Sequence, residues 1–459
     1  MKPFAHQARG IDLASSKNLA LFWSCGTGKT YAALHIIQHW LRLEGGRALV
    51  VSPLSIIDAA WIADAKKFTP DLRVASLWSK DPAKRLESLN GSADVHVVNF
   101  EGLRTMYGLL AAQRYTVLVV DESSKLKNWR SQITRALLSF AGVAFKGSPY
   151  RTDYVIPHRY CLSGTPAPNG EEEYWSQIQF VAPNKVFPVN YWAFRGKYFV
   201  AQPMRFGAKS FKKWTFRGDR KLEFMQRMKA VSDVVRKEDA VDLPEQVHEV
   251  RQVTLGNSEA EAYRSMKKTL ACQVADTEIV APTAMAEIMK LRQITSGFAY
   301  GSDGSAMHIG RSKLDELLEV LEEVGQSQVL IWANFIEEIS FLAKTLKAPA
   351  LYSQTVDREQ AIKDFQEGRS QYLIANPQSA GHGLTFVNCS YCVYFSLNYS
   401  LELWQQSQDR IHRIGQTNNC TYFYLLAKGT IDEVIYAALQ QKRDLSEAVL
   451  SYLRSRVWK

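Results

Sequence analysis

Residues 19–34 read LALFWSCGTGKTYAAL, and this stretch decides the fold of the first part of the chain. An apolar run from Leu19 to Phe22 comes first, a glycine turn follows, and a helical pattern begins at about Thr30. In a unit of strand, glycine turn and helix, consecutive backbone N–H groups face a phosphate and the helix N-terminus adds positive potential. The sequence therefore predicts a phosphate-binding loop at the edge of an α/β sheet.

The side chains of this loop indicate its chemistry. Lys29 is expected to reach the β- and γ-phosphates of a nucleotide, and Thr30 to offer its hydroxyl to Mg²⁺. Trp23 occupies the place of the first glycine of the general pattern. A glycine turn without a ligand is the alternative, but a Lys-Thr pair directly after a strand favours ATP. The residues expected to contact the nucleotide are Gly26, Thr27, Gly28, Lys29 and Thr30.

The rest of the chain extends this pattern into two α/β lobes. Short β-branched runs alternate with helical patterns in the first third of the chain and again after residue 329, which is typical of parallel sheets flanked by helices. The predicted organisation is an ATP-binding lobe at 1–182, a basic and aromatic helical insertion with a linker at 183–245, a second lobe at 246–430 with a helical protrusion at 258–296, and closing helices at 431–459.

Asp121 and Glu122 close the apolar run 117–120, so both carboxylates are expected at the carboxyl end of a parallel sheet, where ligands bind in such folds. An Asp that holds a metal ion beside a Glu that orients water fits this place. Acidic residues also end strands without any catalytic role. Together with the glycine loop, the pair predicts an Mg²⁺-dependent ATPase with Asp121 and Thr30 as metal ligands and Glu122 as a catalytic residue.

Arg410 and Arg413 lie three positions apart, so on a helix they would share one face. Two guanidinium groups on one face can stabilise the charge that develops on a transferring phosphoryl group. A solvated basic helix face is the alternative. We expect both arginines to act in catalysis.

The positive charge of the chain is concentrated in one segment. Residues 185–229 contain twelve basic and two acidic residues, which accounts for the whole formal excess of +10. Cations can neutralise phosphates, and rings such as Trp192 can stack on bases. The alternative is a subdomain whose aromatic residues form its own core. The cations predicted to contact nucleic acid are Lys209, Lys212, Lys213 and Arg217.

Composition excludes other classes of protein. No apolar run is long enough to cross a bilayer and the N-terminus lacks the layout of a signal peptide, so the chain is expected in the cytosol or a nucleus-like compartment, away from membranes. The six cysteines are scattered, as in a reducing compartment. Cys389 and Cys392 form one C-x-x-C without a second pair at zinc-site spacing, and we interpret them as thiols on a buried strand.

Several of these stretches resemble, in order, the motifs of the Swi/Snf-type ATPases of helicase superfamily 2, in particular small bacterial, phage and annealing-type members. The stretch 408–416, QDRIHRIGQ, is close to diagnostic. The other matching stretches are His6-Gln7, 26–30, 49–53 with Trp61, 98–101, 121–124, 162–166, 329–332, 379–385, 243–246 and 442–445.

This resemblance implies two RecA-like lobes with helical insertions and translocation on double-stranded DNA driven by ATP, without strand separation. It also implies adenine recognition by Gln7, a nucleotide contact at Gly383, and DNA contacts at Ser52, Pro53 and Asn99. In the family, arginines of the second lobe complete the nucleotide site. We expect the motor to act as a monomer.

The chain departs from the family at two places. The acidic box continues as Ser123-Ser124, and Trp23-Ser24 replaces an acidic pair before the glycine loop. Both changes affect the coupling between hydrolysis and DNA more than hydrolysis itself. Two alternatives remain open: a helicase that separates the strands of DNA or RNA, and a nucleotide-dependent DNA-binding switch that hydrolyses ATP negligibly.

Overall fold

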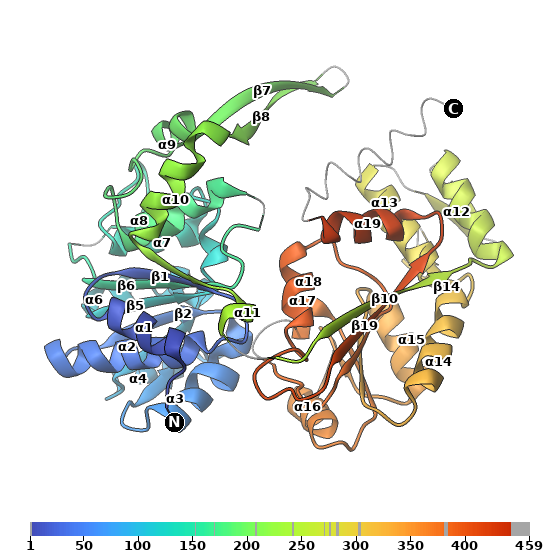
Figure 1. The fold of residues 1–459 in the computed structure, drawn as a ribbon, viewed down its shortest axis with the longest axis horizontal. Helices are drawn as coiled ribbons and strands as arrows, with labels where there is room; N and C mark the ends of the chain where they lie inside the picture. Colours follow the sequence, from blue (N-terminus) through green and yellow to red (C-terminus); the bar gives the residue numbers. More distant parts are fainter. Residues whose placement is uncertain are drawn as a thin grey trace. The chain divides into compact units, whose positions relative to one another are not determined.

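The chain folds into two compact units, residues 1–242 and 243–459 (Figure 1). The computed structural model describes residues 2–151, 153–168, 170–206, 209–240, 243–269, 271–274, 277–280, 284–301, 304–380 and 384–441. Among these residues, no helix is both long and apolar enough to span a membrane. Each unit is built around a parallel sheet.

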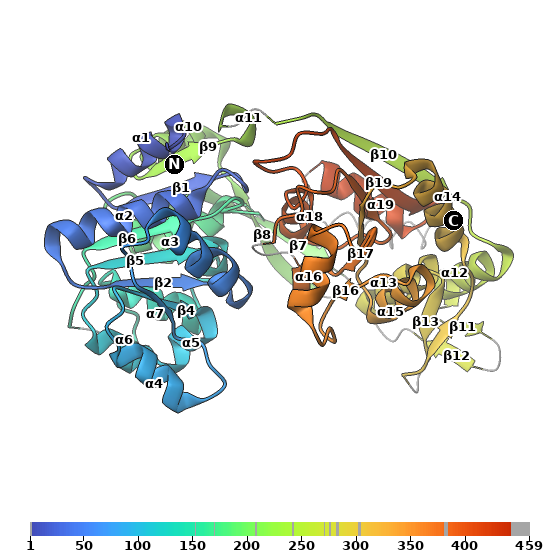
Figure 2. The ribbon, with the colours of Figure 1, turned by 90° about the horizontal axis from the view of Figure 1, so that it is seen from below.

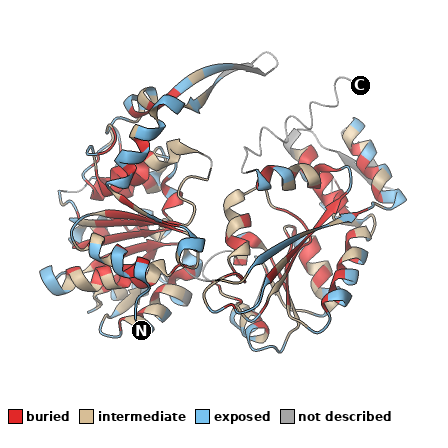
Figure 3. Ribbon diagram, viewed as in Figure 1, coloured by how far each residue is buried: buried red, intermediate tan, exposed pale blue. Residues whose placement is uncertain are grey.

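The first unit contains a seven-stranded sheet of order β3-β4-β2-β5-β6-β1-β9, in which every neighbouring pair of strands is parallel. In chain order the strands are β1 (Leu19–Trp23), β2 (Ala48–Ser52), β3 (Val74–Ser76), β4 (Val95–Asn99), β5 (Val117–Asp121), β6 (His158–Leu162) and β9 (Ser232–Val235). The sheet lies in the buried interior of the unit (Figure 3).

Helices cover both faces of this sheet (Figure 2). Side chains alternate along β1, so Leu19 and Leu21 join one apolar cluster while Ala20 and Phe22 join the other. Helices α1 (Ala5–Ala14), α2 (Lys29–Glu44) and α3 (Ala63–Phe68) pack on the first face. The second face is covered by α5 (Phe100–Thr105), α6 (Tyr107–Ala112), α7 (Gln132–Phe140) and α8 (Tyr174–Val181). The remaining helix of the lobe, α4 (Pro82–Asn90), precedes β4.

The insertion contains helices, as predicted, and also a β-hairpin that the prediction of a helical insertion did not include. Between α9 (Tyr191–Tyr198) and α10 (Lys221–Lys229), strands β7 (Phe199–Phe206) and β8 (Lys209–Phe216) pair antiparallel. The aromatic residues Phe211, Trp214 and Phe216 of β8 are of the type that favours strands. Figure 1 shows the hairpin extending away from the lobe sheet. After α10 and β9, the short helix α11 (Lys237–Ala240) ends the described part of this segment.

The second unit contains a six-stranded parallel sheet of order β10-β19-β18-β15-β17-β16. Its strands are β10 (Gln246–Val253), β15 (Val329–Trp332), β16 (Ala350–Leu351), β17 (Tyr372–Ala375), β18 (Tyr391–Tyr394) and β19 (Cys420–Ala427). The helices are α12 (Asn257–Thr269), α13 (Ala284–Thr295), α14 (Ser312–Val324), α15 (Ile336–Leu346), α16 (Arg358–Gln366), α17 (Pro377–Ala380), α18 (Leu401–Gln408) and α19 (Ile431–Gln440). Helices α14 and α15 cover one face, and α12, α13, α16 and α19 the other.

Two short hairpins interrupt the helices of this unit. Strands β11 (Ala271–Val274) and β12 (Thr277–Val280) separate α12 from α13, so the predicted helical protrusion at 258–296 is two helices and a hairpin. Strands β13 (Phe298–Tyr300) and β14 (Ala306–His308) form the second hairpin. Helix α19 covers the start of the predicted closing helices, whereas residues 442–459 lie outside the described part of the chain.

Candidate nucleotide site

Three of the predicted motifs meet at one edge of the first sheet. Strand β6 lies between β5 and β1, and all three are parallel, so their carboxyl ends point the same way. The glycine loop (residues 26–30) follows β1, and the acidic pair Asp121-Glu122 lies at the end of β5. The Ser-Gly-Thr-Pro turn (residues 163–166) follows β6. The turns are in contact, because a Cβ added at Gly164 would meet Cys25 of the glycine loop.

The glycine loop has the backbone geometry that a phosphate cradle requires. Gly26 and Gly28 both have φ of +80°, a left-handed conformation that favours glycine. Lys29 opens α2, and its Nζ donates to the carbonyl oxygens of Trp23 at 3.0 Å and Ser24 at 3.2 Å. The ammonium therefore lies inside the curve of the loop, while the N-terminus of α2 begins beside it.

Helix α1 holds the loop from the other side. His6 Nε2 lies 2.8 Å from the carbonyl oxygen of Thr27, and Gln7 Nε2 donates to the same oxygen at 3.1 Å. Gln7 Oε1 accepts the backbone N–H of Phe4 at 3.0 Å. A Cβ at Gly28 would clash with the Gln7 amide, which is a second reason for glycine there. Gln7 thus reaches the loop itself, next to the place predicted for the nucleotide.

Trp23 is fully buried and ties β1 to its neighbours. Its Nε1 donates to Asp233 of β9 at 2.8 Å, and Arg9 of α1 pairs with the same carboxylate at 3.1 Å. A Cβ at Gly10 would clash with the Trp23 ring, so α1 packs directly on it. The tryptophan that replaces the expected acidic residue therefore joins α1, β1 and β9.

Asp121 is buried at the end of β5, and Trp61 orients it. Trp61 is fully buried and its Nε1 donates to Asp121 Oδ2 at 3.0 Å. Burial, together with the charge of Glu122, raises the pKa of Asp121, and the nearby Lys29 ammonium and the Trp61 N–H partly offset this. A bound divalent cation would favour the ionised carboxylate in the same way as Lys29.

Glu122 combines an unusual backbone with a carboxylate oxygen that has no partner. Its φ of 53° and ψ of 54° place a non-glycine residue in the left-handed region. Glu122 Oε2 is buried and has no hydrogen-bond partner among the described residues. A buried carboxylate oxygen normally accepts a hydrogen bond, and a water molecule has the O–H donor for it.

Ser123 connects the acidic pair to the turn after β6. Its hydroxyl donates to Gln177 Oε1 of α8 at 2.7 Å. Gln177 Nε2 then donates to the carbonyl oxygens of Pro166 at 2.6 Å and Glu173 at 3.1 Å. Both Ser123 and Gln177 are fully buried. The serine that departs from the family pattern therefore forms a polar link between two motifs of the site.

The residues predicted to track DNA on the first lobe lie at the ends of β2 and β4, where Ser52 and Asn99 are register partners. Ser52 is fully buried, so its side chain is not on the surface. Asn99 Oδ1 accepts the Gly102 N–H at 3.1 Å and caps α5. Pro53 is half-buried. The backbone of Ser52 is buried as well, so the structure offers no surface at Ser52 for the predicted DNA contact.

The arginines of the second unit do not share a helix face, so that prediction is wrong. Helix α18 ends at Gln408, and both arginines lie in the turns that follow. Arg410 is 5% exposed, and its guanidinium donates to the carbonyl oxygens of Gln406 and Leu384, both at 3.0 Å. Arg413 is half-buried. Gly383, predicted to contact the nucleotide, lies outside the described residues.

The cations of the insertion divide into two groups. Lys197, Arg220 and Arg227 surround Glu223, and the hydrogen bond from Lys197 is the largest of the effects that lower the pKa of Glu223 to about 2. Lys212 is exposed, and Arg217 pairs with Asp219 at 3.3 Å. Lys209 and Lys213 lie on the same strand as Lys212, and only their backbone placement is described.

Cys389 and Cys392 are both buried, Cys392 on β18 and Cys389 just before it. Within the described ranges, no group of three or more His, Cys, Asp or Glu side chains could hold a metal ion. The hydroxyl of Thr30 and the carboxylate of Asp121 are hard oxygen donors, the type of ligand that Mg²⁺ prefers.

Sequence reasoning missed three contacts of this site: the bond from Trp61 to Asp121, the link through Gln177, and the contact of His6 with Thr27. In the sequence, Trp61 stands out only as part of a stretch that matches the family. A tryptophan N–H usually has a hydrogen-bond partner when it is buried, so a tryptophan in an apolar helix near an acidic strand end is a usable signal. Gln177 has no comparable sequence signal.

The parallel sheet with a glycine loop, a lysine and an acidic pair on one edge defines an ATP-binding protein of the RecA-like α/β class. The model for the SNF2-related domain matches residues 11–297, and the model for the helicase conserved C-terminal domain matches residues 312–415. The chain belongs to the SNF2-related family, and it is an ATP-hydrolysing enzyme of the helicase-like superfamily.

Known relatives come from phages, bacteria and eukaryotes. The chain is 27% identical to putative protein p41 of Acyrthosiphon pisum secondary endosymbiont phage 1, over 94% of this chain and 93% of that protein. It is 22% identical to the transcription regulatory protein SNF2 of Saccharomyces cerevisiae, over 93% of this chain and 26% of that protein. It is 25% identical to the SWI/SNF-related matrix-associated actin-dependent regulator of chromatin subfamily A-like protein 1 of Xenopus tropicalis, over 98% of this chain.

The chain spans 45% of the length of the Xenopus protein, so it matches less than half of either eukaryotic relative. Among solved structures, the SWI2/SNF2 ATPase core of Sulfolobus solfataricus in complex with double-stranded DNA aligns with a TM-score of 0.44 at 21% identity, covering 100% of this chain and 94% of that one.

The bond from Trp61 to Asp121 generates the first prediction. Trp61→Phe keeps the buried ring but removes the N–H donor, so the carboxylate loses its orientation and its pKa rises further. Loss of such an outer partner lowers metal affinity or activity by about 10- to 100-fold in metal sites. Steady-state ATP turnover across a magnesium titration should show at least a tenfold loss, part of it recovered at high magnesium.

Trp40→Phe is the matched control. Trp40 is also buried, and its Nε1 donates to Tyr160 at 2.7 Å, not to a carboxylate. Its turnover should remain within a few-fold of the parent protein. Equal effects of the two variants on turnover would mean that Trp61 serves only packing.

Proposed function

We propose that this enzyme couples ATP hydrolysis to translocation on double-stranded DNA and thereby remodels DNA or protein–DNA complexes. The observation that carries the proposal is the meeting of the glycine loop, the acidic pair and the Ser-Gly-Thr-Pro turn at one edge of a sheet, in a chain of the SNF2-related family. The cation-rich insertion of the same unit supports a polyanionic track.

The first lobe is proposed to bind ATP and Mg²⁺, and the bound pair supplies the phosphoryl group and the charge that neutralises it. Lys29 would hold the terminal phosphates, and the backbone of 26–29 would cradle them. Thr30 and Asp121 would hold Mg²⁺. Gln7 is proposed to contact the adenine while it supports the loop, and Gly383 to contact the nucleotide from the second lobe.

Glu122 is proposed to orient the attacking water, because its buried Oε2 is without a partner in the described part of the chain. Arg413 is proposed to stabilise the charge on the transferring phosphoryl group. Arg410 was predicted to share this task. Since its guanidinium already donates to two backbone carbonyls, we propose that it fixes the turn that carries Arg413.

DNA is proposed to contact strand β8 of the insertion, which carries three lysines, and the turns after β2 and β4. The contacting residues would be Lys209, Lys212, Lys213 and Arg217, with Pro53 and Asn99 on the lobe. Phosphate contacts of this kind position a protein without reading sequence. The enzyme would act as a monomer, in a bacterial cytoplasm or a nucleus.

Strand separation is a second candidate, favoured by one observation. The β7–β8 hairpin extends away from the lobe and is the kind of element that could act as a wedge (Figure 1). Translocation without strand separation predicts displacement of a triplex-forming strand by ATP but no unwinding of a duplex. A helicase would do both.

The decisive experiment measures ATP turnover with duplex DNA, single-stranded DNA and RNA. We expect duplex DNA to stimulate turnover most. Lys29→Ala should abolish turnover while duplex affinity changes little, and Glu122→Gln should bind ATP but lose about a hundredfold or more in turnover. An ATP turnover rate that does not change when duplex DNA is added would contradict the proposed translocation. Near-parental turnover of Glu122→Gln would support a nucleotide switch that needs no catalytic carboxylate.

The two arginines should behave differently. Arg413→Ala should lower turnover about a thousandfold or more with an unchanged thermal midpoint, as for an arginine finger. Arg410→Ala should lower the thermal midpoint as well, because buried hydrogen bonds to a charged group contribute about 1.5–3 kcal/mol each. Thermal melts and turnover measured on the same preparations separate these outcomes. Parental turnover of Arg413→Ala would show that Arg413 does not act on the transferring phosphoryl group.

The insertion can be tested by the salt dependence of duplex binding. Replacement of Lys209, Lys212, Lys213 and Arg217 by Ala should weaken binding equally on unrelated sequences. Four lost phosphate contacts should flatten the slope of log K against log salt by roughly 3 to 4. Alanine at Lys80, Lys84, Lys363 and Lys428 provides a control of equal charge change. Equal slopes for the two quadruple variants would assign the insertion another role.

A further inference from the structure

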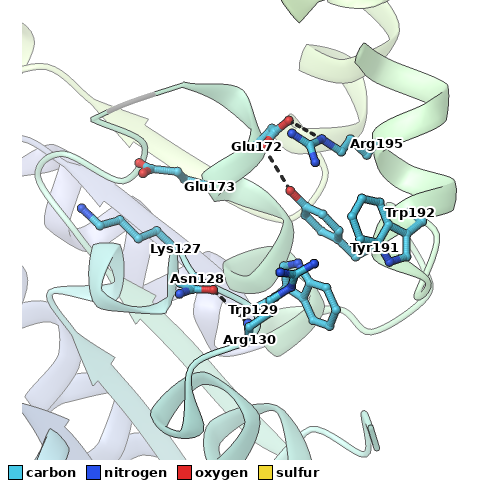
Figure 4. Close-up of a pocket in the computed structure, with 9 residues that line it drawn as sticks. All are labelled: Lys127, Asn128, Trp129, Arg130, Glu172, Glu173, Tyr191, Trp192 and Arg195. Atoms are coloured by element: carbon cyan, nitrogen blue, oxygen red, sulfur yellow. Dashed lines mark hydrogen bonds and ion pairs between the residues drawn. The ribbon is translucent and has the colours of Figure 1, made fainter. Parts of the chain in front are cut away.

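A pocket of about 440 Å³ lies in the first unit, between the loop that follows the acidic box and the first helix of the insertion (Figure 4). Lys127, Trp129 and Arg130 line it from the loop, and Tyr191, Trp192 and Arg195 from α9. All of these residues are described, and none belongs to the nucleotide site. The pocket is therefore a separate feature of the lobe.

Aromatic rings form one side of the pocket. The centroids of Trp129 and Tyr191 lie 5.1 Å apart, and Trp192 stands edge-on to Trp129 at 6.4 Å. Trp192 is 51% exposed, and the segment that carries it is anchored by the Asn190 cap of α9. Arg130 and Arg195 each lie 5.7 Å from the Trp192 centroid, so the part of the ring that can stack on a flat ligand is the part that still faces solvent.

The charged side chains around these rings determine whether the pocket favours an anionic or a cationic ligand. Arg195 donates to Glu172 at 2.8 Å, and Tyr191 donates to the same carboxylate at 3.0 Å. Glu173 is the second carboxylate of the lining, so the cations of the pocket, Lys127, Arg130 and Arg195, outnumber its acids by one. Arg130 lies 5.3 Å from the Trp129 centroid and 5.7 Å from that of Trp192. The positions from which a cation could contact these aromatic rings are therefore already filled by Arg130 and Arg195. This disfavours a cationic ligand such as a methylated lysine.

The same arrangement suits an anion. Lys127 and Arg130 are both exposed, and in the described ranges neither forms an ion pair with a carboxylate. A ligand with a flat π-face and a negative charge would stack on the tryptophan and meet these two cations. A nucleotide has both features. Inside duplex DNA both faces of each base are covered by neighbouring bases, so away from a duplex end only an unpaired nucleotide can stack.

We propose that this pocket binds an unpaired nucleotide of DNA, with its base on Trp192 and its phosphate near Lys127 and Arg130. The proposal rests on the proposed DNA-dependent function and names a preferred form of that substrate: DNA with a single-stranded end or gap next to duplex. Phosphate contacts on the insertion would hold the duplex, and the pocket would recognise the junction.

The pocket is joined to the nucleotide site by short covalent and hydrogen-bonded links. Lys127 follows Ser123 and the 3₁₀ turn η3 (Ser123–Leu126) in the chain. On the opposite rim, the carbonyl oxygen of Glu173 accepts from Gln177, which also bonds Ser123 and Pro166. An unpaired nucleotide in the pocket would therefore bias the position of the acidic box, and junction DNA should raise turnover above that with blunt duplex.

The test compares a labelled blunt duplex with the same duplex carrying a short single-stranded overhang, by fluorescence anisotropy. The parent protein should bind the overhang substrate about tenfold more tightly, since stacking of one base contributes that much or more. Trp192→Ala should lose this preference and keep its blunt-duplex affinity, while Trp192→Phe should retain most of it. Trp78→Ala is the matched control, because Trp78 is 42% exposed elsewhere on the lobe.

A second readout places 2-aminopurine in the overhang, where stacking on an indole quenches its fluorescence. Quenching by the parent but not by Trp192→Ala supports the proposal. Equal affinity of the parent for both substrates, or an overhang preference that survives Trp192→Ala, overturns it and points to a protein partner for the pocket. The proposed motor is judged separately, by stimulation of turnover with blunt duplex, so the two ideas can fail independently.

Discussion

The position of β6 between β5 and β1 is the constraint on which the rest of the first lobe depends. Two parallel neighbours, each about 4.8 Å away, bring the acidic pair to roughly 10 Å from the glycine loop, with the Ser-Gly-Thr-Pro turn between them. That spacing leaves room for phosphates and a cation between Lys29 and Asp121. Every other contact of the site, from Trp61 to Gln177, adjusts side chains that this strand order has already brought together.

Much of this arrangement could be predicted from the sequence, because local signals decide it. The loop at Gly26 and Gly28, the strand before Asp121 and the parallel alternation all follow from patterns of a few residues. Tertiary contacts decide the rest. The spacing of Arg410 and Arg413 fits a helix, but the helix ends first and Arg410 turns inward to backbone carbonyls. Only the folded chain shows that a buried serine meets Gln177.

The insertion shows why net charge is a coarse guide to a binding surface. Its twelve basic residues outnumber the acids, yet Glu223 alone engages three of them, and Glu172 and Asp219 engage two more. The aromatic residues are divided in the same way. Phe187, Phe194 and Phe224 belong to the core of the lobe, whereas Trp192 remains at the surface. Residues that bind a partner are therefore to be sought among the cations that form no ion pair within the protein and the aromatic residues that lie outside the core.

The left-handed backbone of Glu122 has an evolutionary consequence. Such a conformation costs about 1–2 kcal/mol for an ordinary residue, and it is tolerated better by Asn or Gly. Random substitution at this position therefore has a route to a more stable protein that lacks the carboxylate. A lineage in which Glu122 persists is therefore one in which selection for turnover outweighs the stability gained by losing it.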